Sequence, residues 1–329
     1  MTNEKAVKLK LKQLDMFLLD EYKELHEFKR KNPADYEKKF MKRIKGAIRK
    51  LNPLIKEAVN VFYSPKERGR KPKVDIEGKV RILLLKQLIG KSNRMMAYLL
   101  DLFFMMFNVD ISYKTIERLY EDNDVYLVLH NLMIIILEKK GVNNIDASGD
   151  ATCYGLSVTT HYRSDAQKLK EKLKVSKGKK KKYVYKFTLM DLKTRMYVCY
   201  GTSLKSEKDA YNKAMIYLRQ LGISLNSIRL DRYYSNHSDV NKFKDCKIYF
   251  IPKKNVTMQH GLYWNERLTD FVENTFEYLK EYFKRNNSEA GFAADKRLLG
   301  WRISQKKEDR MDTAILAKVV WRNLFHLSG

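Results

Sequence analysis

Residues 145–152 read Ile145-Asp-Ala-Ser-Gly-Asp150-Ala-Thr152, and they open the part of the chain whose pattern decides the fold. From about residue 143 the helical spacing of apolar residues gives way to the pattern of β-strands, the first at 145–154. Further elements are expected after it: strands at 183–191, 196–202, 227–230 and 247–251, a turn at 193–195, and helices at 207–221, 265–299 and 308–325. This order predicts an α/β domain, a mixed sheet flanked by helices, over residues 141–329.

Carboxylates at the ends of these strands are informative because the chain has few acidic residues, 39 against 66 Lys and Arg. Asp146 and Asp150 lie on the first strand, and Asp231 follows the strand at 227–230. In an open α/β sheet such strand ends form the crevice where ligands bind. Two carboxylates there, joined by a third, would hold Mg²⁺, although a single Asp at a strand end is more often a cap or turn residue.

A stripe of polar residues follows in the expected helix at 265–299. Tyr282, Arg285, Glu289 and Lys296 are spaced by three, four and seven residues. At ~100° per residue they fall within a stripe about 60° wide on one helix face. Spacing alone would also fit a solvated face carrying salt bridges.

The pattern Tyr282-x2-Arg285-x3-Glu289-x6-Lys296 resembles the signature of DDE transposases of cut-and-paste insertion sequences. In that family the first Asp is often followed by x-Thr on the first strand of a ribonuclease-H-like fold. Asp150-Ala-Thr152 matches this better than Asp146-Ala-Ser148 does, and the two cannot ligate the same metal pair because they lie ~13 Å apart along a strand.

The second family motif, Asp-x-x-Tyr after an apolar strand, resembles Asp231-Arg-Tyr-Tyr234. The resemblance covers about residues 143–325. Only 57 residues separate Asp231 from Glu289, so there is no room for the large β insertion domain of the bigger family members.

The resemblance implies a metal-dependent phosphoryl transfer on DNA. Asp150, with Asp146 as the alternative, would join Asp231 and Glu289 in holding two Mg²⁺ or Mn²⁺ ions. The implied activity is cleavage and strand transfer at the terminal inverted repeats of a mobile element. The alternatives are a catalytically inactive DNA-binding descendant of a transposase and a structure-selective nuclease of the same fold.

The cations of the signature take DNA-binding roles under the same resemblance. Arg285 and Lys296 would contact phosphates beside the cut end, and Tyr282 would stack or hydrogen-bond there. A catalytic Glu would then share its helix face with two phosphate ligands.

Residues 1–140 are expected to form an all-α DNA-binding region. Apolar-periodic segments at 79–89, 92–107 and 112–121 are compatible with a helix-turn-helix over 79–121, although any three-helix bundle gives this pattern. Within it, Lys114, Thr115 and Arg118 are the candidates for the major groove.

Two basic stretches are further candidates for DNA contacts. Arg68-Gly-Arg70-Lys71-Pro72, within the polar linker at 64–74, is close to the Arg-Gly-Arg-Pro core of an AT-hook, with a plain basic linker as the alternative. Residues 168–182 hold nine lysines in fifteen positions, which indicates either a solvated loop or a nucleic-acid clamp.

Composition supports a polyanionic partner. The formal charge of +27 over 329 residues is unusual for an enzyme with small neutral substrates and favours double-stranded DNA, both element ends and target. The three cysteines are far apart, which excludes a disulfide scaffold and a zinc finger and indicates a reducing compartment. No secretory or membrane-spanning segment is expected. The sequence thus predicts a homodimer on DNA in the cytoplasm, at the nucleoid of a prokaryotic cell.

Overall fold

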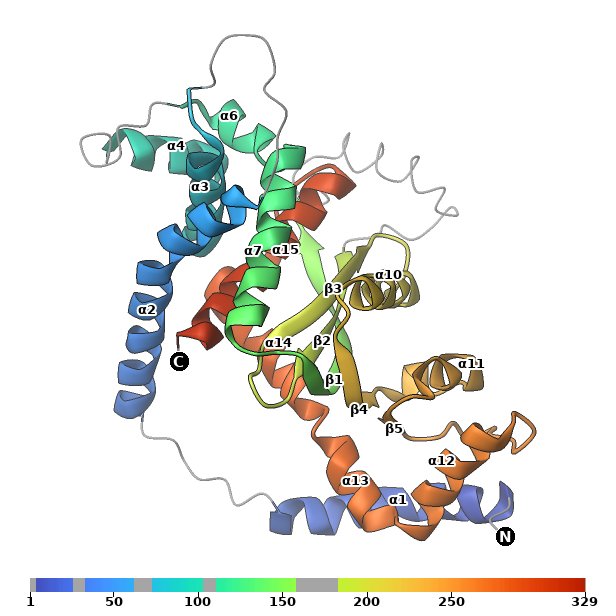
Figure 1. Cartoon of the computed structure of the whole chain (residues 1–329). Coiled ribbons are helices and arrows are strands. Elements are labelled where there is room, and N and C mark those ends of the chain that lie inside the picture. Colours follow the sequence, from blue (N-terminus) through green and yellow to red (C-terminus); the bar gives the residue numbers. More distant parts are fainter. Residues whose placement is uncertain (1–3, 26–32, 62–72, 103–110, 158–182, 329) are drawn as a thin grey trace.

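The computed structural model describes residues 4–25, 33–61, 73–102, 111–157 and 183–328. Its central feature is one sheet of six strands, which lies between layers of helices (Figure 1). The strands are β1 (Asn144–Leu156), β2 (Tyr183–Asp191), β3 (Tyr197–Ser203), β4 (Ser224–Leu230), β5 (Lys247–Tyr249) and β6 (Arg302–Ile303).

The strand order is β3-β2-β1-β4-β5, with β6 pairing only with β1. β1 is antiparallel to β2 and β2 to β3, whereas β4 runs parallel to β1 and β5 parallel to β4. β4 pairs with the first half of β1, up to Gly149, and β6 pairs in parallel with its last residues. This mixed sheet confirms the predicted α/β class and is compatible with a ribonuclease-H-like fold.

The turn between β2 and β3 shows how local sequence sets the register. Asp191 accepts hydrogen bonds from the backbone N–H groups of Lys193 (3.3 Å) and Thr194 (2.8 Å). Arg195 then takes a left-handed conformation with φ 64°. An Asp at the start of a turn commonly closes it in this way, and the turn predicted at 193–195 is confirmed.

The helices account for most of the remaining described residues. They are α1 (Glu4–Leu25), α2 (Pro33–Asn60), α3 (Ile76–Ile89), α4 (Asn93–Leu102), α6 (Tyr113–Arg118), α7 (Asn123–Lys139), α10 (Glu207–Gln220), α11 (His237–Val240), α12 (Leu262–Glu273), α13 (Thr275–Phe283), α14 (Asn286–Leu299) and α15 (Glu308–Leu327), with short 3₁₀ segments η1 (Arg232–Tyr234) and η2 (Asn241–Phe243). Among these residues, no helix is both long and apolar enough to cross a membrane.

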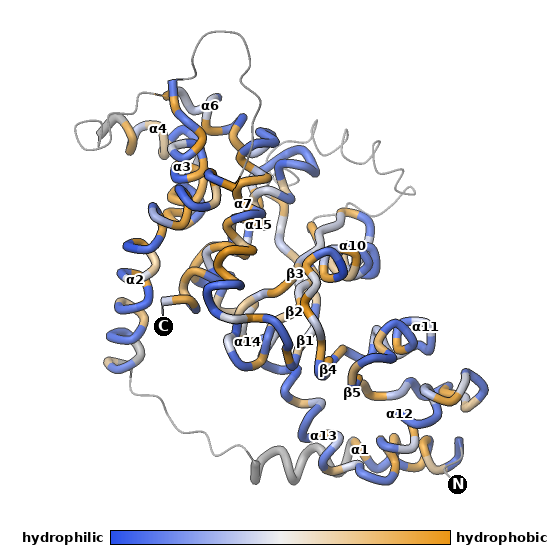
Figure 2. The backbone as a smooth tube through the Cα atoms, viewed as in Figure 1, coloured by the Kyte–Doolittle hydropathy of each residue, from blue (hydrophilic) through white to orange (hydrophobic). Residues whose placement is uncertain are grey.

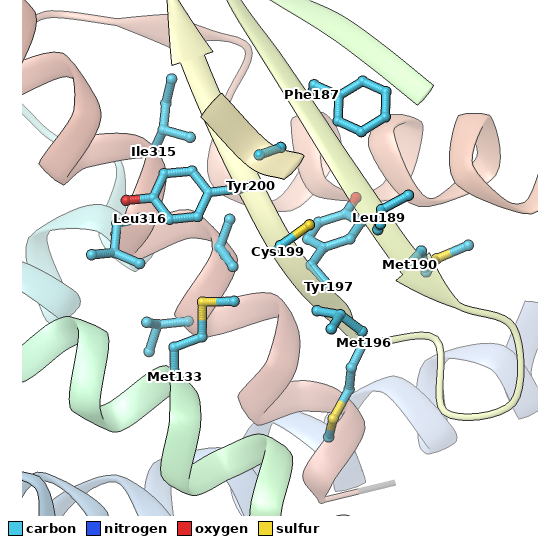
Figure 3. Packing of buried hydrophobic residues seen from close by; sticks show 14 of the residues in the cluster. Met133, Phe187, Leu189, Met190, Met196, Tyr197, Cys199, Tyr200, Ile315 and Leu316 are labelled. Carbon is cyan, nitrogen blue, oxygen red and sulfur yellow. The ribbon is translucent and has the colours of Figure 1, made fainter. Parts of the chain in front are cut away.

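The two faces of the sheet are covered by different helices. α10 packs on β2 and β3 from one side, while α14 packs on β1 and α15 on β3 from the other. α7 lies against α15, and Met133 of α7 approaches the same core as Tyr200 of β3 and Leu316 of α15 (Figure 3). Hydrophobic residues are accordingly concentrated on the strands, α7 and α15 (Figure 2).

The predicted continuous helix at 265–299 is wrong, because three helices occupy this stretch. α12 ends at Glu273, because the backbone of its C-cap Asn274 (φ −111°, ψ 36°) leaves the helical region. The boundary between α13 and α14 is a tightened turn in which Arg285 N–H donates to Tyr282 O (2.9 Å) and Ser288 N–H to Arg285 O (2.9 Å). Such i→i−3 bonds tighten the turn, and no proline or glycine at this boundary indicates it in the sequence.

The N-terminal helices pack into the same core as the sheet domain. α2, α3 and α7 contact α15, and Trp321 of α15 donates an indole N–H bond to Leu84 O of α3 (2.7 Å). α1 instead packs on α12. The regular elements among the described residues of this half are helices joined by turns. Its role as a DNA-binding region and its separate domain boundary near residue 140 stay predictions.

Candidate active site

Asp150 and Asp231 meet at the point where β4 ends beside β1. β4 pairs with β1 as far as Gly149, so Asp231, the residue after β4, comes to lie beside Asp150. Asp150 Oδ1 accepts from the N–H of Ala151 (2.8 Å), and Asp231 Oδ1 accepts from the N–H of Tyr233 (2.8 Å) as the N-cap of η1. These bonds orient each carboxylate and leave its Oδ2 for other partners.

Arg285 joins these two carboxylates to a third. Its Nη1 lies 2.9 Å from Asp150 Oδ2, 3.5 Å from Asp231 Oδ2 and 2.9 Å from Glu289 Oε1. Glu289 is in the first turn of α14, one turn after Arg285. The structure therefore brings Asp150, Asp231 and Glu289 around one guanidinium nitrogen, although they come from three different elements.

The three carboxylates differ in exposure. The side chain of Asp150 is 13% exposed, that of Asp231 37% and that of Glu289 54%. Burial raises the pKa of Asp150 to about 6, and the neighbouring Arg285 opposes this rise by favouring the ionised form. The cluster thus runs from a buried carboxylate to one that faces solvent.

The donor set fits a hard divalent cation. Carboxylate oxygens are the ligands that Mg²⁺ prefers, and all three carboxylates already point at one positive charge. The carboxylate oxygens lie 2.9 to 3.5 Å from Arg285 Nη1, whereas oxygen ligands lie ~2.0–2.1 Å from a bound Mg²⁺. Accordingly, no three His, Cys, Asp or Glu side chains among the described residues are close enough to hold one ion as they stand. Arg285 would have to move for a cation to enter.

Tyr282 and Lys296 extend the same face on either side of Arg285. Tyr282 is 5% exposed, its ring lies 5.8 Å from the Arg285 guanidinium, and burial raises the pKa of its hydroxyl to about 12. Lys296 Nζ donates to Thr152 Oγ1 (2.6 Å), two residues along β1 from Asp150. Arg285 and Lys296 therefore both contact β1, and Tyr282 lies beside Arg285, despite the break between α13 and α14.

Asp146 lies apart from this cluster. Its carboxylate accepts a hydrogen bond from Ser227 and lies 3.8 Å from Arg229 Nη1, and its side chain is 53% exposed. Arg229 is 3% exposed and also pairs with Glu281 of α13. Asp146 thus belongs to a separate ion-pair network nearer the start of β1.

Two serines missed by sequence reasoning hold α14 against β1. The hydroxyls of Ser148 and Ser288 lie 2.5 Å apart, and Ser148 Oγ also donates to Arg285 O (3.1 Å). Both serines are fully buried. Their positions carry a signal, because Ser148 shares the strand face of Asp150 and Ser288 immediately precedes Glu289.

The DNA-binding candidates of the first half fall into two groups. Lys114 and Arg118 are both exposed on α6, whose N-cap Ser112 accepts from the N–H of Thr115 (3.3 Å). Arg68, Arg70 and Lys71, like the lysines at 168–182, lie outside the described residues.

Comparison with known proteins identifies the family. The chain is 44% identical over 283 residues, 86% of its length and 84% of the relative's, to the probable transposase for insertion sequence element ISA1214 of Archaeoglobus fulgidus. The chain belongs to the transposases of insertion sequence elements. No family model matches this transposase and no solved structure matches it.

Proposed function

We propose that this transposase cuts DNA at the ends of its own insertion sequence and joins the ends to a target by metal-dependent phosphoryl transfer of the DDE type. The observation that carries the proposal is the convergence of Asp150, Asp231 and Glu289 on Arg285 Nη1 at the end of β4. The sheet order, with an antiparallel β1–β3 meander followed by parallel β4 and β5, supports a ribonuclease-H-like catalytic domain.

Asp150, Asp231 and Glu289 would hold two Mg²⁺ or Mn²⁺ ions. Such ions, when bound, lower the pKa of an attacking water or 3′-hydroxyl and stabilise the leaving oxygen. Glu289 is the most exposed of the three carboxylates, so the site is open to solvent on the side of Glu289.

The basic residues of the cluster would bind the DNA strand. Arg285, once released from the carboxylates, carries a planar guanidinium suited to a phosphate, and Lys296 presents a point charge beside Thr152. Lys114 and Arg118 of α6 would contact the duplex away from the cut, with Arg68, Arg70 and Lys71 as further contacts. The partner is double-stranded DNA, and the active form is a homodimer on the two ends, acting in the cytoplasm at the nucleoid.

The test is incubation of the purified chain with the inverted repeats that flank its own reading frame. With Mg²⁺ we expect strand cleavage at the element ends, followed by joined products, and with EDTA neither. Cleavage without joining would favour a structure-selective nuclease, and binding without cleavage would favour an inactive descendant of a transposase.

A further inference from the structure

A basic pocket lies at the C-terminal end of β1, away from the candidate active site. It has a volume of about 280 Å³ and lies between α3 and the segment that holds β6. Its polar lining includes Lys86, Lys91, Arg302 and Gln305, beside the indole of Trp301. No carboxylate lines it among the described residues, so its chemistry is that of hydrogen-bond donors and an aromatic ring.

Lys86 marks the pocket as a place for an anion. Its side chain is only 7% exposed, and no described carboxylate lines the pocket beside it. Its closest described charge-stabilising contact is the ring of Tyr120, 5.0 Å from Nζ. Burial lowers the pKa of Lys86 to about 8, so the ammonium is still mostly protonated at neutral pH. A nearly buried ammonium at the wall of a pocket is costly to keep charged, and an anionic ligand in the pocket would compensate that cost.

Trp301 supplies a flat apolar surface at the same place. It is 55% exposed, whereas the other two tryptophans, Trp264 and Trp321, are 3% and 0% exposed. The guanidinium of Arg302 lies 4.3 Å from the centre of its ring, so a base that stacks on this ring face would take the place of the guanidinium. Arg302 is itself exposed and can turn toward a phosphate.

The backbone that carries Trp301 is held in place. Trp301 O accepts from the N–H of Gly155 on β1 (3.1 Å), and Gly300 O accepts from Lys318 Nζ (2.6 Å). A ligand would therefore bind to a main chain that the fold already orders, and binding would lose little conformational entropy there.

The pocket also lies in line with the candidate active site. Arg302 pairs with Gly155, five residues after Asp150 on β1, which at 3.3 Å per residue is roughly 16 Å. Lys296, bonded to Thr152, lies between the two sites. A strand of DNA could cover this distance with a few nucleotides.

We propose that this pocket binds an unpaired nucleotide of the DNA strand that enters the active site, with its phosphate near Lys86 and Lys91 and its base stacked on Trp301. The proposal rests on the proposed function for the origin of the strand. An unpaired nucleotide is favoured over a duplex because the pocket is small and a paired base inside a helix offers no free face for stacking.

The stacking half is tested by intrinsic fluorescence, because Trp301 is the exposed tryptophan. In EDTA, where no cleavage occurs, ten-nucleotide oligothymidylate should quench the emission of the wild type, and Trp301→Phe should lose that quenching. Trp301→Ala should bind the oligonucleotide about tenfold more weakly, within the range measured for base–aromatic stacking. Unquenched wild-type emission, or unchanged affinity in Trp301→Ala, would overturn the assignment.

The phosphate half is tested by the salt dependence of the same binding. Lys86→Met, and Lys91→Met as a variant at an exposed position, should each flatten the slope of log K against log salt by about 0.7, the value for one phosphate on a single strand. Lys193→Met, at the exposed turn between β2 and β3, is the matched control and should leave the slope unchanged. Equal slopes for all three variants would overturn the assignment of the phosphate.

Two competitors separate a DNA strand from a free ligand. Thymidine monophosphate and inorganic phosphate, at the same phosphate concentration as the oligonucleotide, should displace it poorly. Displacement as strong as by unlabelled oligonucleotide would show a site for a free nucleotide or anion and overturn the proposal. Because these measurements use no metal, the subsite can fail while metal-dependent cleavage stands, and the reverse also holds.

Discussion

Arg285 is the residue on which the candidate active site depends. It contacts Asp150, Asp231 and Glu289 through one nitrogen, and its own side chain is 13% exposed. Sequence reasoning can predict that Arg285 and Glu289 share a face, because their spacing of four residues is readable. It cannot predict that the guanidinium stands among the carboxylates, because its bond to Asp150 joins positions 135 residues apart.

Glu289→Gln should abolish strand cleavage while leaving DNA affinity within about twofold of wild type. The substitution keeps the shape of the side chain but removes the charge of a proposed metal ligand, and Glu289 is exposed enough for the change to leave the fold intact. Cleavage and binding are measured on the same element-end duplex, by denaturing gel and by mobility shift. Cleavage at more than a few per cent of the wild-type rate would remove Glu289 from the site.

Asp150→Asn and Asp146→Asn form a matched pair on one strand. Asp150 lies in the carboxylate cluster, whereas Asp146 contacts Ser227 and Arg229 instead. We expect the Asp150 variant to lose cleavage completely and the Asp146 variant to keep it, with at most a modest loss of stability because Asp146 is more than half exposed. The cleavage rates are compared at equal protein concentration. An inactive Asp146 variant together with an active Asp150 variant would mean that Asp146, not Asp150, is the first Asp of the motif.

Arg285→Gln should destabilise the metal-free protein and make its stability depend on divalent cations. Removing the guanidinium leaves three carboxylates facing one another. The loss in free energy of unfolding should be somewhat below the ~3–5 kcal/mol typical of a broken buried ion pair, because Glu289 is half exposed. Thermal melting with and without Mg²⁺ is the measurement. Mg²⁺ should raise the melting temperature of the variant more than that of wild type, and Lys284→Gln, one position away and exposed, should show no such difference.

At the scale of elements, the strands are readable from the sequence and the breaks between helices are not. β1, β2 and β3 are predicted within about two residues at each end because their apolar runs are bounded by turn residues. β6 is two residues long and too short to carry a pattern. α12, α13 and α14 read as one helix because the two boundaries contain neither proline nor glycine, and only the i→i−3 bonds around Arg285 separate the last two.

The packing of β3 on α10 depends on one glycine. A Cβ on Gly201 would lie 2.1 Å from Ala210 O and 2.6 Å from Ala214 N, both backbone atoms of α10. Gly201→Ala should therefore push the helix from the sheet and cost about 3 kcal/mol of unfolding free energy, at the upper end of the usual cost of overpacking. Gly155→Ala on β1, where the nearest atom is 3.4 Å away in a side chain, is the control and should cost less than about 1 kcal/mol. Similar urea midpoints of unfolding for the two variants would show that α10 can shift away from β3 at little cost in stability.

At the scale of the whole molecule, the pocket at Lys86 draws on both halves of the sequence. It combines α3 with residues that follow α14, more than 200 positions later. No spacing rule connects such positions, so only the packing of α3 on α15 reveals the pocket. The net charge of +27, in contrast, is visible in composition alone and already indicates a polyanionic partner.

That charge leads to the last prediction, on the lysine-rich residues 168–182, which lie outside the described part of the chain. If they act as a clamp on DNA, replacing Lys179, Lys180, Lys181 and Lys182 with Ser should flatten the slope of log K against log salt by up to ~0.9 for each phosphate that the protein no longer neutralises. The matched control replaces four exposed lysines of α2 with Ser, namely Lys38, Lys39, Lys42 and Lys45, and so removes the same charge elsewhere. Binding of the element-end duplex is measured at four or more salt concentrations for all three proteins. Equal flattening in both variants would mean that overall charge, rather than this segment, attracts the DNA, and no flattening in the first would mean that the segment is only solvated.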